Sequence, residues 1–289
     1  MTKGYRHCGF SLIELIVVIV ILGALATGAG LLILKPIEAY DAQQRRTQLV
    51  DQGEMALRQI ARDVQAALPN SLRTASGAGL EAVEMVNTVD GARYRDQIGG
   101  EFVADTDTLE FSGNDTDFNF LGTLNNLTPG VINARLVIYN TSSAGIYSDA
   151  ALNNNPGIIT PSSSTLTLSL NTPPSEDVEH HIAISAPGFQ FSQQSPGQRA
   201  FLVDGPVSYV CNPGAGSIIR YSGYAYSIAQ PLPPAGGTAD TVISRLSSCA
   251  ITYTSGSLQR GDILSLAITI SDSGENINLF HQVHVVNLP

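Results

Sequence analysis

The chain has 289 residues, a formal net charge of −10 at pH 7, and only 14% charged residues. This acidic balance argues against nucleic acid as a main partner, because phosphate binding requires clustered lysine and arginine. The length allows one large domain or two small ones. The low charge, together with 27 glycines and 15 prolines, favours an exported β-rich domain over a cytosolic helical enzyme.

A short basic stretch precedes a long apolar segment at the N-terminus. Lys3 and Arg6 come before residues 10–34, in which Glu14 is the only charged residue. At about 1.5 Å per residue, a helix over this segment is long enough to cross a bilayer core of about 30 Å. Basic residues on the N-terminal side predict that this end stays cytoplasmic. The sequence therefore predicts a single transmembrane helix, with the rest of the chain outside the cytoplasm.

A cleaved secretory signal and a plain membrane anchor are the simpler interpretations of this segment. A secretory signal has an apolar region of about 7–15 residues, followed by a small-residue cleavage site. Here the apolar run is longer, and the best small residue, Gly9, comes before it. We therefore expect the apolar helix to be retained.

Glu14 is unusual in this setting, because a carboxylate inside a transmembrane helix costs a few kcal/mol. If the mature chain begins at Phe10, Glu14 lies close to the new N-terminus. The free amine of a neighbouring subunit would then be a natural counter-charge. Such a pair would offset the cost of burial and set the axial register of one helix against the next.

The run GFSLIELIVVIVILG, residues 9–23, resembles the class III signal peptide of type IV prepilins. The shared pattern is Gly9, an aromatic residue, three further residues, Glu14 and an unbroken apolar run. The resemblance implies that residues 1–9 are a leader peptide, which a prepilin peptidase removes by cutting after Gly9. It also implies methylation of the new N-terminal residue, Phe10, and contact between Glu14 and the amine of an adjacent subunit.

The helix is predicted to continue beyond the membrane as an amphipathic segment over residues 35–69. Its apolar residues recur at steps of three and four, which predicts one buried stripe. The stripe consists of Val50, Gly53, Leu57, Ile60, Ala61, Val64 and Leu68. Pro36 removes one helical hydrogen bond and predicts a kink near the membrane interface. Arg62 and Asp63 are interpreted as a solvated face, with a functional pair as the alternative.

Residues 70–289 show short alternating runs separated by turn residues, which predicts a β-rich periplasmic head domain. The predicted strands cover residues 108–113, 134–140, 165–170, 181–186, 189–192, 200–205, 206–211, 217–226, 249–255, 263–271 and 278–289. Residues 171–177 and 230–240 have the composition of loops. The predicted fold class is α+β: a pilin-like fold, in which a long N-terminal transmembrane helix packs on an antiparallel β-sheet head.

The chain has three cysteines: Cys8, Cys211 and Cys249. Because the C-terminal part is predicted to lie outside the cytoplasm, Cys211 and Cys249 are predicted to form a disulfide. Closing a loop of this size stabilises a fold by roughly 4 kcal/mol in the chain-entropy treatment.

No set of residues predicts catalysis, a metal site or a cofactor, so we expect the protein not to be an enzyme. His281 and His284 are three apart on a predicted strand, so their side chains point to opposite faces and cannot share a metal ion. Residues 114–119, NDTDFN, carry oxygen ligands at alternate positions. A calcium loop would continue with glycine and end with glutamate, but Phe120 and Asn126 occupy those positions. This run is interpreted as a solvated turn, with calcium binding as the alternative.

Four tyrosines gather between the two C-terminal cysteines. They are Tyr209, Tyr221, Tyr224 and Tyr226. Packing in the core or on a sheet surface is the preferred interpretation, and sugar binding is the alternative.

The length and several C-terminal runs narrow the resemblance to particular groups of prepilin-like proteins. ARDVQAALPNS, at the end of the predicted helix, resembles the large minor pseudopilins of the J/W type. RAFLVDGPVSYVCNP, IRYSGYAY and FHQVHVVNLP resemble the MshO family of the mannose-sensitive haemagglutinin (MSHA) pilus. The resemblance implies an inner-membrane minor pilin that primes or caps a type IV pilus. Its partners would be the prepilin peptidase, other minor and major pilins, an inner-membrane assembly platform and membrane lipid. The alternatives are a tip adhesin and the J-type minor pseudopilin of a type II secretion system.

Overall fold

The computed structural model describes residues 9, 11–97, 108–171, 178–256 and 261–287, without the side chains of residues 27 and 29–34. The chain divides into two compact units, Met1–Val50 and Asp51–Pro289. Each unit is described by itself. Over the described part of the chain, no helix combines the length and the apolar character needed to cross a membrane.

One long helix, α1 (Leu12–Gln65), begins in the first unit and ends in the second. Pro36 lies inside α1 and does not end it, and the kink expected there stays a prediction. The helix ends at Gln65, earlier than predicted. The physical reason is that the next residues join a strand: Ala67 bridges to Asn87, and the N–H of Leu68 donates to the carbonyl of Val86 at 2.8 Å.

The predicted apolar stripe is confirmed in the part of α1 that belongs to the second unit. Its members there, Gly53, Leu57, Ile60, Ala61 and Val64, are all buried, and so is Leu68 just beyond the end of the helix. Gly53 permits a close approach of the helix to a sheet. A Cβ atom at this position would lie 2.2 Å from Cδ1 of Leu279 and 2.8 Å from Cδ1 of Ile270. A larger residue than glycine would therefore require the side chains of Leu279 and Ile270 to shift.

The described residues of the second unit form three antiparallel sheets and a short helix, α2 (Ser143–Leu152). The largest sheet has the order β1-β2-β8-β9-β10, with β5 paired to β8. Its strands are β1 (Arg73–Gly77), β2 (Leu80–Arg93), β5 (Arg135–Ile138), β8 (Arg199–Asn212), β9 (Ser217–Ser222) and β10 (Thr238–Ser244).

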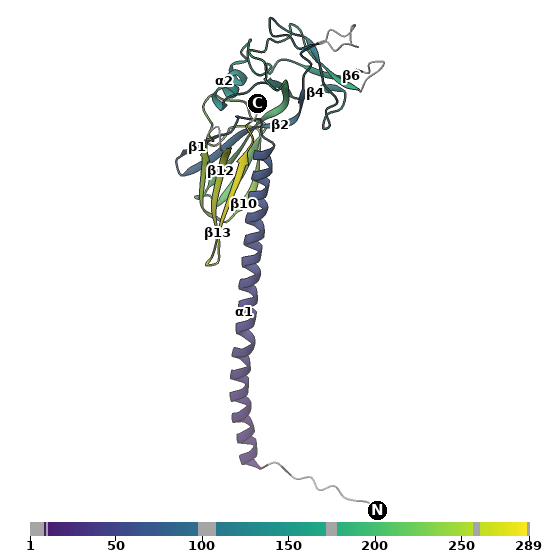
Figure 1. Ribbon diagram of the computed structural model, residues 1–289. Coiled ribbons are helices and arrows are strands. Elements are labelled where there is room, and N and C mark those ends of the chain that lie inside the picture. Colours follow the sequence, from purple (N-terminus) through teal and green to yellow (C-terminus); the bar gives the residue numbers. More distant parts are fainter. Residues whose placement is uncertain (1–8, 10, 98–107, 172–177, 257–260, 288–289) are drawn as a thin grey trace, which may run out of the picture. The chain divides into compact units, whose positions relative to one another are not determined.

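The other two sheets have three and four strands. One has the order β11-β12-β13, from β11 (Leu246–Thr254), β12 (Asp262–Asp272) and β13 (Glu275–Val285). The other has the order β3-β7-β6-β4, from β3 (Asp117–Phe120), β4 (Gly130–Ile132), β6 (Leu166–Asn171) and β7 (Glu179–Ile184). Within this unit, α2, β4 and β6 lie toward one end, and β10, β12 and β13 toward the other (Figure 1).

Two apolar clusters form the core at the end that carries α2. One surrounds the β3-β7-β6-β4 sheet and includes Phe118, Phe120, Phe189 and Phe191. The second packs α2, through Ile146 and Tyr147, against β2 and β8. Aromatic side chains bury large areas, so these clusters supply much of the stability of this part of the unit.

Several predicted strands are confirmed with shifted bounds, and others are wrong. Residues 108–110 have no regular structure and residues 111–113 form bends, because the side chain of Asp115 accepts the N–H of Glu110 at 2.8 Å and turns the backbone. Residues 189–192 make only isolated bridges. The runs 200–205 and 206–211 form one strand, β8. The run 217–226 leaves the sheet after Ser222, where Gly223 adopts a φ of +71°. Residues 288–289 of the last predicted strand lie outside the described residues.

The prediction missed several elements of the second unit. They are β1, β2, β3, β4, β10 and α2. In β2, the acids Glu81 and Glu84 interrupt the expected alternation, yet Glu84 is only 1% exposed. β3 overlaps the run 114–119, interpreted from the sequence as a solvated turn. That interpretation is wrong for β3, because Phe118 and Phe120 are fully buried in the aromatic cluster. Of the predicted loop 171–177, residues 172–177 lie outside the described residues.

Candidate processing segment and polar clusters of the head

The start of α1 is fixed by its own side chains. Ser11 precedes the helix, and its Oγ accepts the N–H of Glu14 at 3.2 Å. The carbonyl of Ser11 also accepts the N–H of Leu15 at 3.2 Å. Ser11 is thus the N-cap residue, which satisfies one of the backbone donors that every helix start leaves free. Gly9 is exposed just before it, while Phe10, the predicted methylated residue, lies outside the described residues.

This geometry gives Glu14 a local role that our sequence analysis missed. Ser11 and Glu14 occupy the first and last positions of the S-x-x-E pattern that marks a capping box. A negative charge in the first turn also interacts favourably with the positive end of the helix dipole. Glu14 therefore suits the helix start regardless of any neighbour, and its predicted pairing with another subunit's amine stays a prediction.

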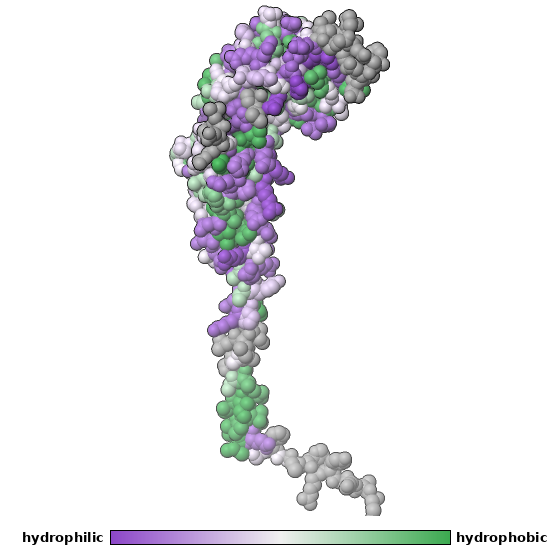
Figure 2. All heavy atoms as spheres, viewed as in Figure 1, coloured by the Kyte–Doolittle hydropathy of each residue, from purple (hydrophilic) through white to green (hydrophobic). Residues whose placement is uncertain are grey.

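The first turns of α1 expose apolar side chains on every side. The exposed fraction of the large apolar residues between Leu12 and Leu25 runs from 41% at Val18 to 78% at Leu12. Figure 2 shows this stretch as largely green, the colour of apolar residues. A helix that is apolar all round normally lies within lipid or among other helices. The segment thus presents a contact surface, because water-soluble monomers rarely expose a continuous apolar patch of this kind.

Residues 5–30 match the prokaryotic N-terminal methylation motif. This type IV prepilin-like signal includes Gly9, Phe10, Ser11 and Glu14. It implies processing by a prepilin peptidase and association with other pilins. Comparisons with curated proteins and with solved structures found no match. The methylation motif therefore identifies a pilin-like N-terminal segment, and the head must be interpreted from its own structure.

Asp63 fastens the end of α1 to the large sheet. Its Oδ2 accepts the hydroxyl of Tyr209 at 2.7 Å and Nε of Arg220 at 2.9 Å. Burial, followed by the hydrogen bond and charge of Asp63, raises the pKa of Tyr209. The interpretation of Asp63 as part of a solvated face is therefore wrong, whereas Arg62 is exposed as expected. The spacing of the apolar stripe carried no signal for this anchor, because Arg220 and Tyr209 lie far away in the sequence.

A second polar cluster surrounds Glu84, a buried carboxylate of β2. Tyr224 donates its hydroxyl to Oε1 of Glu84 at 2.7 Å, and Nε of Arg73 lies 2.5 Å from Oε2. Burial raises the pKa of Glu84, although the hydrogen bonds from Tyr224 and Arg73 oppose this shift. Arg73 also donates to the carbonyls of Ser227 and Ile228 at 2.9 and 2.7 Å. The cluster thus holds the chain that follows β9 against β1 and β2.

The tyrosines singled out in the sequence mostly belong to these clusters. Tyr209 is fully buried and Tyr224 is 6% exposed. The ring of Tyr226 lies 6.1 Å from that of Tyr147, which in turn stacks under the guanidinium of Arg73 at 3.5 Å. Packing is confirmed for Tyr209 and Tyr224, because buried rings cannot present a platform to a sugar.

The predicted disulfide between Cys211 and Cys249 is confirmed, with Cα atoms 6.3 Å apart. Cys211 lies near the end of β8 and Cys249 lies in β11, so the bond joins the largest sheet to the β11-β12-β13 sheet. A hydrogen bond reinforces this junction, since the N–H of Ile251 donates to Oε2 of Glu81 at 2.5 Å.

The residues considered for metal binding have other partners or separate faces. The carboxylate of Asp115 accepts the N–H groups of Glu110 and Asp117, and burial raises its pKa. These contacts turn the chain into β3 and use oxygens that a calcium loop would need. His281 and His284 face opposite sides of the sheet, as predicted: His284 is exposed, while His281 shares the partly buried side.

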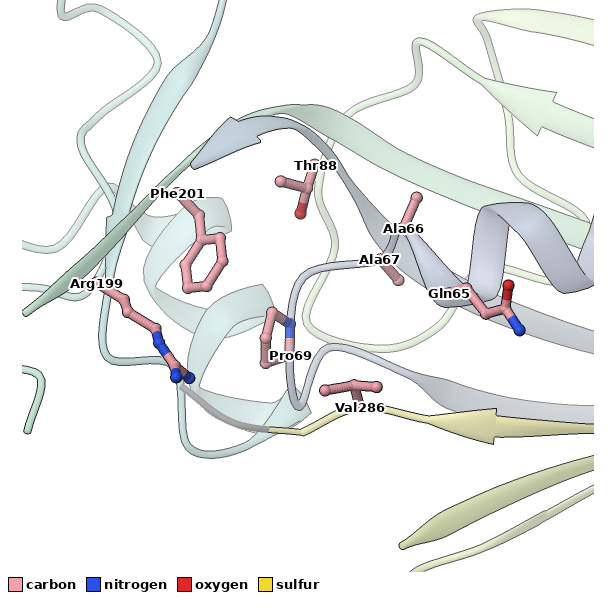
Figure 3. Close-up of a pocket in the computed structure, with 8 residues that line it drawn as sticks. All are labelled: Gln65, Ala66, Ala67, Pro69, Thr88, Arg199, Phe201 and Val286. Carbon is pink, nitrogen blue, oxygen red and sulfur yellow. The ribbon is translucent and has the colours of Figure 1, made fainter. Parts of the chain in front are cut away.

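A cavity of about 430 Å³ lies where α1 ends, within the second unit. Figure 3 shows Pro69, Phe201 and Val286 around it, with Arg199 at one side. Among the described residues that line it, Arg199 is the only charged one. The lining offers apolar contact and one guanidinium, without a nucleophile beside a base.

Proposed function

We propose that this protein is a minor pilin, which primes or caps the assembly of a type IV pilus of the MSHA type. The methylation motif at residues 5–30 is the observation that carries the proposal. The exposed apolar start of α1 supports it, because such a surface requires lipid or neighbouring helices. A head with its own core and disulfide suits a subunit that must persist outside the cytoplasm.

The proposal includes a location and an orientation. Residues 10–34 would lie in the inner membrane, with the N-terminus cytoplasmic and the head periplasmic, and the assembled subunit would sit at the pilus tip. Lys3 and Arg6 on the N-terminal side support this orientation. After removal of residues 1–9, Glu14 would pair with the amine of a neighbouring subunit and set the register between helices. The protein's role would be structural rather than enzymatic.

The finer assignment rests on the resemblance to the MSHA pilus biogenesis protein MshO. The resembling runs supply β8, β9 and β13, which are central parts of the head. The J-type pseudopilin of a type II secretion system would share the same N-terminal motif and a similar size. A tip adhesin is less well supported, because two of the tyrosines considered for sugar binding, Tyr209 and Tyr224, are buried.

The test is a clean in-frame deletion in the native host, with surface pili counted by microscopy and the cellular major pilin measured in parallel. We expect few pili at a normal level of major pilin, restored by the wild-type gene and not by a Glu14→Gln copy. Normal pili with lost secretion of exported enzymes would instead assign the chain to a secretion system. Normal pili with lost attachment would identify an adhesin, and an unchanged strain would contradict the proposal.

A further inference from the structure

The β11-β12-β13 sheet has an outer face that carries no charge. Alternate residues of each strand point away from the helix side, and we call them the outer face. They are Ser248, Ala250, Thr252 and Thr254 of β11, Ile263, Ser265, Ala267, Thr269 and Ser271 of β12, and Asn276, Asn278, Phe280, Gln282 and His284 of β13. Within these described strands, every outward residue is uncharged apart from the titratable His284. In a chain of net charge −10 this is an unusual surface.

Several polar groups of the outer face bond to one another. Ser248 donates to Thr269 at 2.8 Å, and Thr269 donates to Oδ1 of Asn278 at 2.8 Å. On the other side of the face, Gln282 donates to Ser265 at 3.1 Å. Burying a polar group is costly mainly when it loses its hydrogen bonds. The side chains that already bond to each other can therefore be covered by protein at a low desolvation cost.

One row of the outer face pairs an apolar projection with an apolar hollow. The register places Ala250, Ala267 and Phe280 side by side across the three strands. Phe280 is 66% exposed, although a ring of this size gains much from burial. The two alanines beside it contribute to a hollow of about 390 Å³. An exposed aromatic ring surrounded by uncharged polar residues is the composition of an interface centre.

This arrangement is self-complementary. Rotation by half a turn about an axis along β12 places the β13 of a second copy opposite β11 of the first. Phe280 of each copy then lies over Ala250 and Ala267 of the other, because all three share one row. Two sheets packed in this way keep their strands aligned and about 10 Å apart. The missing charges also matter, since two acidic chains can approach only through surfaces that do not repel.

We propose that the outer face is a docking surface for a second copy of this chain, with Phe280 as its anchor. The face is smaller than the roughly 20–30 residues per partner of a standard interface, so the pair forms weakly and must be trapped to be seen. The inference does not depend on the proposed function, because it uses only the geometry and charge of this sheet.

The experiment traps the pair in the full-length chain, in membranes or mild detergent, with Cys8→Ser as the background. Ala267→Cys places a thiol next to the proposed axis, and a short bis-maleimide can span the sheet separation of about 10 Å. Ala239→Cys is the matched control, because Ala239 is an exposed strand alanine of another sheet. We expect a cross-linked dimer several-fold more abundant for Ala267→Cys than for Ala239→Cys.

A second change tests the anchor. Adding Phe280→Asp to Ala267→Cys should reduce the dimer to the level of the control, because each copy would bury a charge. Val131→Asp, at another exposed apolar residue, should leave the dimer unchanged. Protection of Cys211 and Cys249 from alkylation confirms that each variant is folded. Equal cross-linking by both cysteine variants, an adduct containing a different protein, or a dimer insensitive to Phe280→Asp would each overturn the proposal.

Discussion

The two units of this protein place their apolar side chains in opposite ways. In the first unit, large apolar residues such as Leu12 and Val20 are 78% and 64% exposed. In the second unit, comparable residues such as Leu136 and Ile146 are fully buried. The second unit thus buries its own apolar side chains, whereas the apolar side chains of the first unit require contact with lipid or other helices. The difference teaches that the N-terminal helix supplies the surface for contact with lipid or other helices, whereas the head is stabilised by its own core.

The largest effect is expected at Gly9. Gly9→Val should abolish processing, because the cut by the prepilin peptidase is predicted directly after this glycine. The mass of the chain recovered from membranes should show an intact leader. The head should keep its disulfide, because Cys211 and Cys249 both lie in the second unit. A correctly cut variant would contradict the role of this segment.

The next effect tests how much the disulfide stabilises the head. Replacing Cys211 and Cys249 together by alanine should lower the free energy of unfolding by roughly 4 kcal/mol, because the unfolded chain regains the entropy of a closed loop. Tyrosine fluorescence during denaturant unfolding of the full chain can measure this, as the protein has no tryptophan. Processing at Gly9 should continue normally. A loss below about 1 kcal/mol would show that the sheet junction does not need the bond.

A smaller effect is expected at Asp63. Asp63→Ala leaves the hydroxyl of Tyr209 and Nε of Arg220 without the acceptor that they share. An unsatisfied buried group costs about 1–3 kcal/mol, so unfolding should become easier by that amount. Asp51→Ala, at an exposed acid of the same helix, should change stability by less than about 0.5 kcal/mol. Equal effects of the two substitutions would contradict the role of Asp63 in holding α1 on the sheet.

The start of α1 allows its two proposed roles to be separated. Ser11→Ala removes the cap and should cost about 1 kcal/mol of helix stability. Glu14→Gln keeps a side chain suited to a capping box but removes the charge. We expect Glu14→Gln to be cut normally and to co-assemble poorly, and Ser11→Ala to co-assemble better than Glu14→Gln. Normal pili with Glu14→Gln, counted by microscopy, would limit Glu14 to its local role.

The smallest effect is a dependence on pH within the head. Nδ1 of His180 accepts the N–H of Leu124 at 2.7 Å, and burial lowers the pKa of His180. Because the unfolded chain takes up this proton at a higher pH, stability should be complete above about pH 6.5 and fall as the pH drops below it. His180→Asn should flatten this part of the profile in unfolding experiments. An unchanged profile would exclude His180 as its cause.

Local patterns in the sequence predicted what depends on neighbouring residues. The stripe from Gly53 to Leu68, the pairing of Cys211 with Cys249, and most C-terminal strands follow from spacing, compartment and alternation. The predictions that failed concern residues whose partners are distant in sequence. Asp63 looked solvated because Tyr209 and Arg220 are remote, and β2 was missed because Glu84 is buried with Arg73 and Tyr224. The cap formed by Ser11 could have been predicted, since its S-x-x-E pattern was visible.

The most direct test of the central claim is the N-terminus of the mature protein, isolated from membranes of the native host and examined by mass spectrometry. A pilin-like subunit should begin at Phe10, carry one methyl group on its amine and have lost residues 1–9. A chain that still contains its leader, or that begins elsewhere, would contradict this account of the protein.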